Sequence, residues 1–91
     1  MKFDWDAGKA QKNLEKHGIT FELATLAFFD PNAAVVEDSR HDCGEDRFVI
    51  FGRIADRLYA VVDTKNETSG STRIISARKA RRRERKEHDN C

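Results

Sequence analysis

The middle of the chain contains four apolar segments of strand length that follow one another with little chain between them. They are Ala33–Glu37, Arg47–Ile54, Leu58–Thr64 and Arg73–Ala77. Polar stretches separate these segments, and Ala55-Asp56 is typical of a tight turn. Because consecutive strands with short connections usually pair as antiparallel neighbours, the pattern predicts a meander. Such a sheet needs a cover for its apolar face, and the rest of the chain has to supply it.

The beginning of the chain predicts that cover. KFDWD alternates aromatic and acidic residues as a half-buried strand does. Ala7–Lys16 has helical apolar spacing after a candidate cap, Asp4 or Asp6. Phe21–Phe29 predicts a second helix, more buried than the first and contributing its Phe residues to the core. The predicted fold class is α+β, in the order β-α-α-β-β-β-β-α, with an antiparallel sheet and two N-terminal helices on one face.

The charges are distributed unevenly along the chain. Residues 1–72 hold nine Lys and Arg against thirteen Asp and Glu, whereas residues 73–91 hold eight against three. The basic segment predicts a final helix at about Lys79–His88 with too little apolar surface to be held by the core. It must lean on the domain through its first turn or be ordered by a partner. Such asymmetry favours a basic face that meets nucleic acid or an acidic partner.

Length and composition exclude several classes of protein. A chain of 91 residues fits one domain, 1–91, with 79–91 as a basic C-terminal helix and tail. Cys43 and Cys91 lie far apart without zinc-site spacing and are interpreted as free thiols. No apolar run approaches the length of a membrane span. We therefore expect a cytoplasmic protein with no metal, no cofactor and no membrane contact.

Three segments of the sequence resemble the BrnT family of type II toxins. They are FDWDAGKAQKNLEKHGITFELA, GEDRFVIFG and RIISARKARRRER, and the resemblance extends in order over residues 2–86. It implies a RelE-like fold and an endoribonuclease toxin that cleaves mRNA and inhibits translation. Two family tyrosines are replaced here, one by Asp63 and one by His88.

RNA cleavage without a metal uses the 2′-hydroxyl as nucleophile, so the protein must remove a proton and neutralise phosphate charge. Arg47, Arg73 and Arg78 form a set compatible with the second task, and the family pattern gives weight to RIISAR. Glu45 shares a strand face with Arg47, where it can act as general base, orient Arg47 or form an ordinary surface pair. Strand alternation places Arg73 and Ser76 on opposite faces, unless the strand twists or ends near Ser76, where the serine would cap a helix. The candidate catalytic residues are Glu45, Arg47, Arg73 and Arg78.

Other residues are candidates for binding RNA. Lys9, Asn13 and His17 recur every four residues and form a stripe on the first helix. The stripe can bind phosphate and base or form a polar seam, and the structural role is favoured for Asn13 and His17. The candidate RNA-binding residues are Lys9, Ser76, Lys79, Arg82 and His88.

The resemblance leaves two classes of function open. The first is an active endoribonuclease neutralised by a BrnA-like antitoxin. The second is a catalytically weak or inactive toxin-like module that works through its antitoxin in regulating an operator. In both, operator DNA is reached only through the antitoxin, and the chain can form an oligomer within the toxin–antitoxin complex. Nonspecific binding of polyanions by residues 78–86 is a third possibility, and high salt should abolish it.

Overall fold

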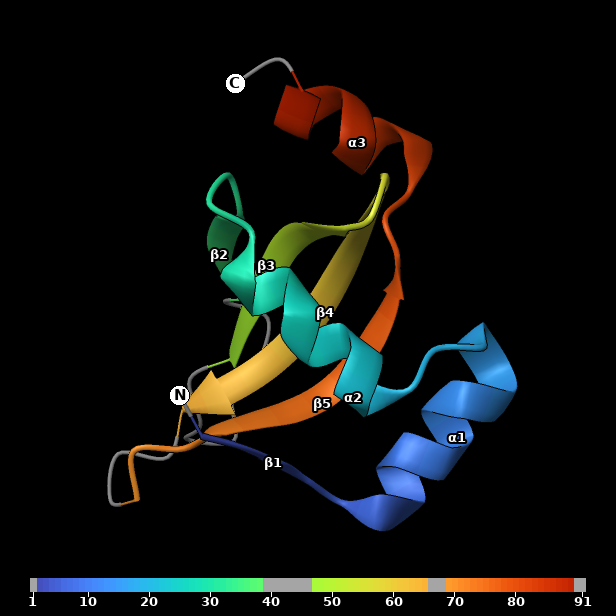
Figure 1. The fold of residues 1–91 in the computed structure, drawn as a ribbon, viewed down its shortest axis with the longest axis vertical. Helices are drawn as coiled ribbons and strands as arrows, with labels where there is room; N and C mark the ends of the chain where they lie inside the picture. The colour runs from blue at the N-terminus through green and yellow to red at the C-terminus, as the bar shows by residue number, and fades with distance from the viewer. Residues whose placement is uncertain (1, 39–46, 66–68, 90–91) are drawn as a thin grey trace.

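The structure, a computed structural model, describes residues 2–38, 47–65 and 69–89. These residues form one five-stranded sheet and three α-helices, which confirms the α+β class (Figure 1). Within the described chain, no helix combines the length and apolar character needed to cross a membrane. The elements are β1 (Phe3–Trp5), α1 (Ala7–His17), α2 (Phe21–Ala24), the 3-10 helix η1 (Thr25–Phe29), β2 (Ala34–Asp38), β3 (Arg47–Ile54), β4 (Arg57–Lys65), β5 (Thr72–Lys79) and α3 (Arg82–Asp89).

The sheet is mixed, with the strand order β1-β5-β4-β3-β2. Strands β2 to β5 form the predicted antiparallel meander. Strand β1, however, runs parallel to β5. The prediction of an antiparallel sheet is therefore wrong for this strand. The rule for consecutive strands does not apply to β1, because helices and three other strands separate it from β5 in the chain. Strand β1 can therefore enter the sheet in either direction.

Local hydrogen bonds fix the ends of α1 and the start of α2. The Asp6 carboxylate accepts a hydrogen bond from Lys9 N at 2.9 Å, which confirms one of the two predicted caps. Gly18 ends α1 in the left-handed conformation, with φ 71°. Thr20 Oγ1 then accepts a hydrogen bond from Leu23 N at 3.1 Å. These short-range contacts explain why the predicted bounds of the first helix agree with the structure to within one residue.

The second helix is shorter and less buried than predicted. It ends at Ala24, and η1 continues with Leu26 and Phe29, whose exposed fractions are 49% and 65%. The expectation that this Phe-rich segment is wholly core is therefore wrong. Its inner side lies very close to β3, since a Cβ added to Gly52 would lie 2.2 Å from the Ala27 carbonyl oxygen. Glycine is the residue that allows this approach of backbone to backbone.

The core lies between one face of the sheet and the segment formed by α2 and η1. In Figure 1, α2 crosses in front of the sheet and α1 lies beside β5. The Trp5 ring packs edge to face on Phe21, with centroids 5.9 Å apart. The buried apolar cluster consists of Ile19, Phe21, Ala24, Ala27, Ile50, Val61, Ile74 and Ala77.

The last strand is longer and the last helix begins later than predicted. Strand β5 includes Lys79, which the sequence placed in the helix, and Ala80 N still donates a hydrogen bond to Leu58 O at 3.0 Å. Pairing with β4 thus holds the chain extended beyond the predicted end at Ala77. Helix α3 starts only at Arg82 and has no buried residue, in agreement with the expectation that little burial holds it.

Candidate functional site

A row of paired residues crosses the sheet and carries two arginines. Arg47 of β3 pairs with Thr64 of β4, and Thr64 pairs with Arg73 of β5. Because directly paired residues share a face, the three side chains project from the same face of the sheet. The two arginine Cα atoms are separated by two strand spacings, about 10 Å. Two side chains as long as arginine can converge on one anion across that distance.

A β-bulge in β5 places Ser76 on the same face as Arg73. Val62 lies opposite Ser76 and Thr64 lies opposite Arg73, so β5 has one residue more than β4 between these pairs. The prediction that strand alternation separates Arg73 from Ser76 is therefore wrong, as is the alternative of Ser76 as a helix cap. We call the face of the sheet that carries Arg73 and Ser76 the open face. Its described residues on β3, β4 and β5 include Arg47, Val49, Phe51, Ala60, Val62, Thr64, Arg73, Ser76 and Arg78.

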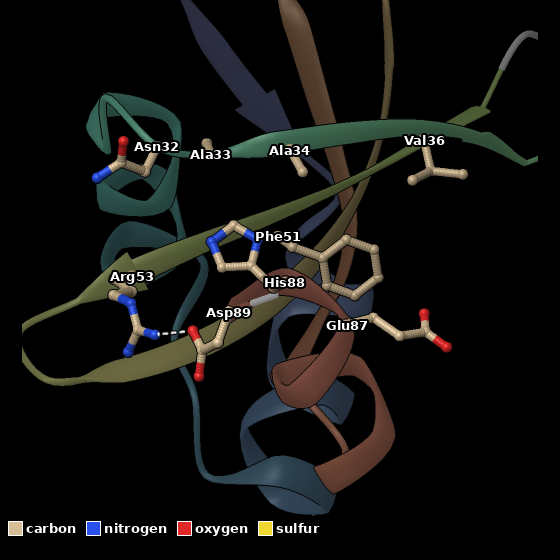
Figure 2. A pocket seen from close by; sticks show the side chains of 9 residues that line it. All are labelled: Asn32, Ala33, Ala34, Val36, Phe51, Arg53, Glu87, His88 and Asp89. Atoms are coloured by element: carbon tan, nitrogen blue, oxygen red, sulfur yellow. Dashed lines mark hydrogen bonds and ion pairs between the residues drawn. The ribbon is translucent and has the colours of Figure 1, made fainter. Parts of the chain in front are cut away.

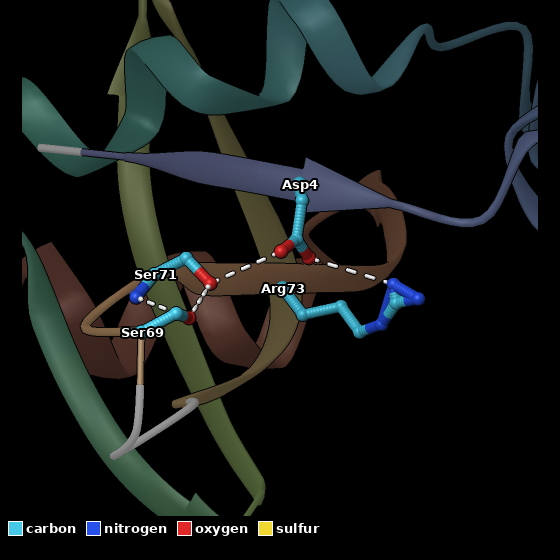
Figure 3. Close-up of polar contacts among 4 residues, drawn as sticks. All are labelled: Asp4, Ser69, Ser71 and Arg73. Carbon is cyan, nitrogen blue, oxygen red and sulfur yellow. Dashed lines mark hydrogen bonds and ion pairs between the residues drawn. The ribbon is translucent and has the colours of Figure 1, made fainter.

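Asp4 of β1 lies beside Arg73 and holds it loosely. Its Oδ1 is 3.5 Å from Arg73 Nη1, and its Oδ2 accepts a hydrogen bond from Ser71 Oγ at 3.0 Å (Figure 3). The side chains of Arg73 and Asp4 are 48% and 49% exposed, so this ion pair contributes little and opens easily. Arg73 therefore keeps most of its five N–H donors available for phosphate oxygens.

Arg47 is half-buried in the same row. Its Nε is buried and has no hydrogen-bond partner in the part of the chain that the structure describes. A buried N–H group of a cation is costly to leave unsatisfied, so an anion bound over the open face would stabilise it. The predicted general base, Glu45, lies outside the described residues, two positions before Arg47.

Arg78 is paired with the beginning of α3. Its Nη1 and Nη2 donate hydrogen bonds to the two carboxylate oxygens of Glu84 at 2.7 and 2.9 Å. Glu84 also accepts a hydrogen bond from Arg81 N at 2.7 Å and so caps the helix. The contact with Arg78 lowers the pKa of Glu84 to about 2. The predicted contact of Arg78 with RNA phosphate therefore competes with Glu84 for the charge and for two of the five N–H donors of the guanidinium.

A pocket of about 580 Å³ lies between α3 and the sheet (Figure 2). Val36 and Phe51 line it from the sheet, and His88 lines it from the helix, half-buried. An ion pair between Arg53 and Asp89 links the sheet to the end of the helix beside this pocket. His88, a predicted RNA contact, thus lies over the part of the open face that carries Phe51 and not in the row that carries Arg47.

Asn13 attaches α1 to the edge of β5. Its Nδ2 donates hydrogen bonds to Ala77 O at 2.9 Å and to Ile19 O at 3.0 Å, and its Oδ1 accepts one from Ala77 N at 3.0 Å. The carboxamide thus satisfies β5 backbone groups beyond the reach of β1, as a neighbouring strand would. This confirms the structural role favoured for Asn13. Next to it, a groove of about 290 Å³ is lined by Lys9, Lys12, Asn13, Lys16, His17, Ile75 and Ser76.

Two of the predicted RNA contacts are not part of the open face. Lys79 pairs with Tyr59, one position further along β5 than Arg78, and alternation puts it on the opposite face. Arg82 is exposed at the start of α3. Of the remaining candidates, Ser76 lies on the open face and Lys9 lines the groove beside it.

Asp63, which replaces a family tyrosine, lies on the core side of the sheet. It follows Val62 in β4 and pairs with the buried Ile74, and its side chain is 2% exposed. Burial raises the pKa of its carboxyl group, although Lys65 Nζ, 3.3 Å from Oδ1, acts against this rise. Asp63 therefore does not take part in the arginine row.

Two residues of the row, Asp4 and Thr64, are not among the site residues that the sequence predicts. For Asp4 the sequence predicts only a helix cap, and 69 positions separate it from Arg73, so no local pattern connects them. For Thr64 the sequence predicts only the end of a strand. In the described ranges, no three His, Cys, Asp or Glu side chains are grouped as a metal site requires. The open face itself offers cationic hydrogen-bond donors, those of Arg47 and Arg73.

Comparison with known proteins gives one family. The family model described as the ribonuclease toxin BrnT of type II toxin–antitoxin systems matches residues 5–84. The matched range contains Arg47, Thr64, Arg73, Ser76 and Arg78 of the open face, and Asp4 lies one position before its start. No curated protein matches the chain.

Proposed function

Because the chain belongs to the BrnT family of ribonuclease toxins of type II toxin–antitoxin systems, we propose that its open face binds and cleaves RNA. The observation that carries this proposal is the register that aligns Arg47 and Arg73 on either side of Thr64. Guanidinium groups match the oxygens of a phosphodiester, whose negative charge grows in the transition state. Arg47, whose buried Nε has no hydrogen-bond partner among the described residues, and Arg73, with its loose ion pair, are both suited to this task.

The proposed reaction is transphosphorylation without a metal. The 2′-hydroxyl of RNA loses its proton to a base and attacks the adjacent phosphorus, the bond from phosphorus to the 5′-oxygen breaks, and that oxygen leaves with a proton. Glu45 is the proposed base, while Arg47 and Arg73 stabilise the charge on the phosphate. Asp4 positions Arg73 before RNA binds. The products are a 2′,3′-cyclic phosphate and a 5′-hydroxyl end.

The other candidate residues are proposed to act at the margins of this site. Arg78 contributes to the phosphate clamp in competition with Glu84. Ser76 can donate a hydrogen bond from the open face. The remaining proposed RNA contacts are Lys9, Lys79, Arg82 and His88.

Membership of the family gives the chain an RNA target and an antitoxin partner. We propose that the antitoxin is BrnA-like and carries the contacts with operator DNA. We further propose that residues 1–91 form one domain of RelE-like fold that cleaves mRNA in the cytoplasm, inhibits translation and forms an oligomer with its antitoxin. The basic segment 79–91, which includes α3, is proposed to contact RNA or the antitoxin at the margin of the site.

The second candidate function is an inactive module that acts through the antitoxin. It is favoured by the ion pair that occupies Arg78 and by the replacement of a family tyrosine by His88. Such a module would bind the antitoxin and leave RNA intact.

RNA cleavage by the purified chain in the presence of EDTA distinguishes the two functions. We expect cleavage that leaves 2′,3′-cyclic or 3′-phosphate ends, together with growth arrest on expression that the antitoxin relieves. Fragments with 5′-phosphate ends, or cleavage that EDTA abolishes, would contradict the proposed chemistry. A harmless chain that binds the antitoxin and leaves RNA uncut would establish the second function.

A further inference from the structure

The groove between α1 and β5 concentrates positive charge at the edge of the sheet next to the open face. Lys9, Lys12 and Lys16 line it, and their side chains are exposed. In the described residues, no carboxylate forms an ion pair with any of these lysines. Their spacing of three and four residues puts them on one side of α1, in a row about 10 Å long. The groove therefore presents exposed ammonium groups in a line.

The groove is continuous with the open face through Ser76. Ser76 lines the groove and also belongs to the open face, because the bulge aligns it with Val62. The extra residue of the bulge lies between Ile74 and Ser76, which makes it Ile75, and this side chain lines the groove as well. A chain that crosses the open face over Arg73 can therefore continue across β5 into the groove.

We propose that this groove binds the sugar–phosphate backbone of single-stranded RNA next to the cleavage position. The inference rests on the proposed function and adds a second binding surface to it. Ammonium groups in a row fit successive phosphates, and the apolar Ile75 side chain offers a surface for a sugar or base. Asn13 fixes the geometry, because its carboxamide locks α1 to β5 at the floor of the groove.

The distribution of exposed apolar residues favours RNA over a protein as the ligand of this groove. Protein interfaces depend on buried apolar and aromatic anchors. The exposed residues Leu26, Phe29, Val35 and Val36 belong to η1 and β2, and β2 is the sheet edge opposite β1 and β5. On α1, Leu14 is exposed but does not line the groove. A protein partner would find its apolar anchors on η1 and β2 and not in the groove.

Binding of an uncleavable RNA tests the groove directly. The probe is a fluorescent 12-nucleotide RNA with 2′-O-methyl groups, and its affinity is measured by anisotropy over a range of salt concentrations. The double variant Lys12→Gln with Lys16→Gln is expected to bind about tenfold more weakly and to lower the salt slope of log K by about 1.4, because each phosphate contact on a single strand contributes about 0.7. The matched control, Lys2→Gln with Arg57→Gln, removes the same charge elsewhere and should keep the wild-type slope.

Cleavage of two substrates separates the groove from the proposed catalytic site. For the groove variant, the ratio of kcat/KM on a 12-nucleotide RNA to that on a dinucleotide should fall about tenfold relative to the wild type. An unchanged salt slope for the groove variant would overturn the inference. Loss of antitoxin binding by this variant with RNA binding intact would also overturn it, since the groove would then be a protein-docking site. A wild-type chain that cleaves neither substrate would refute the proposed function, and the binding assay would still decide about the groove.

Discussion

Replacement of Asn13 by alanine is expected to destabilise the fold by about 3–5 kcal/mol. The change removes three hydrogen bonds and leaves the N–H and C=O of Ala77 and the C=O of Ile19 without their partner. Ala77 and Ile19 are 0% and 3% exposed. An unsatisfied buried polar group costs about 1–3 kcal/mol, and water entering from the neighbouring groove can offset part of the total. Against a total stability of about 5–14 kcal/mol for a domain of this length, the loss is large.

Urea denaturation measures this loss, followed through the fluorescence of Trp5, the single tryptophan, which packs on Phe21. Gln11→Ala is the matched control, because Gln11 is exposed on the same helix and its removal should change stability by less than about 0.5 kcal/mol. If Asn13→Ala lost less than about 1 kcal/mol, the carboxamide would not be the attachment of α1 to β5. The groove would then be held together by contacts other than those of Asn13.

Two further predictions concern packing and pH. Gly52→Ala should lower the free energy of unfolding by about 3 kcal/mol in urea denaturation, because its Cβ would lie 2.2 Å from the Ala27 carbonyl oxygen. A loss below about 1 kcal/mol would show that the segment around Ala27 moves away freely. The Glu84 carboxylate, with its pKa lowered from 4.5 to about 2, stabilises α3 above pH 4.5, and this contribution is lost as the pH falls towards 2. The amide protection factors in α3, which correct the exchange rate for its intrinsic pH dependence, should therefore fall over that pH interval. In Glu84→Gln they should be low already at pH 6, and high protection in the variant would mean that other contacts hold the helix.

The parts of the fold that the sequence predicted are those set by local chemistry. Helices α1 and α2 start at the caps Asp6 and Thr20, and α1 ends at Gly18, through contacts within a few residues. The strands of the meander follow apolar patterns with short turns. The direction of β1 and the change from α2 to η1 depend on packing against distant residues. Gly52 and Ala27 meet across 25 positions of the chain, and no local pattern announces that contact.

The sequence predicted only part of the candidate site, because the rest of the site also depends on contacts between distant residues. The sequence identified Arg47, Arg73 and Arg78, because the chemistry of phosphate and the family resemblance select arginine. It could not place them correctly relative to Ser76, because one extra residue in a strand reverses the face of everything beyond it. The sequence also did not predict the ion pair between Glu84 and Arg78. It predicted a helix that begins at Lys79, whereas β5 ends at Lys79 and α3 begins only at Arg82.

The single-turnover rate of RNA cleavage by Arg73→Ala tests the central claim most directly. Arg73 is 48% exposed and pairs only loosely with Asp4, so the variant should keep the unfolding midpoint of the wild type. Loss of a donor that stabilises transition-state charge should slow cleavage about 10²–10³-fold, whereas Arg57→Ala at the turn between β3 and β4 should cleave at the wild-type rate. A folded Arg73→Ala variant that cleaves RNA as fast as Arg57→Ala would contradict the assignment of the open face as the site of cleavage.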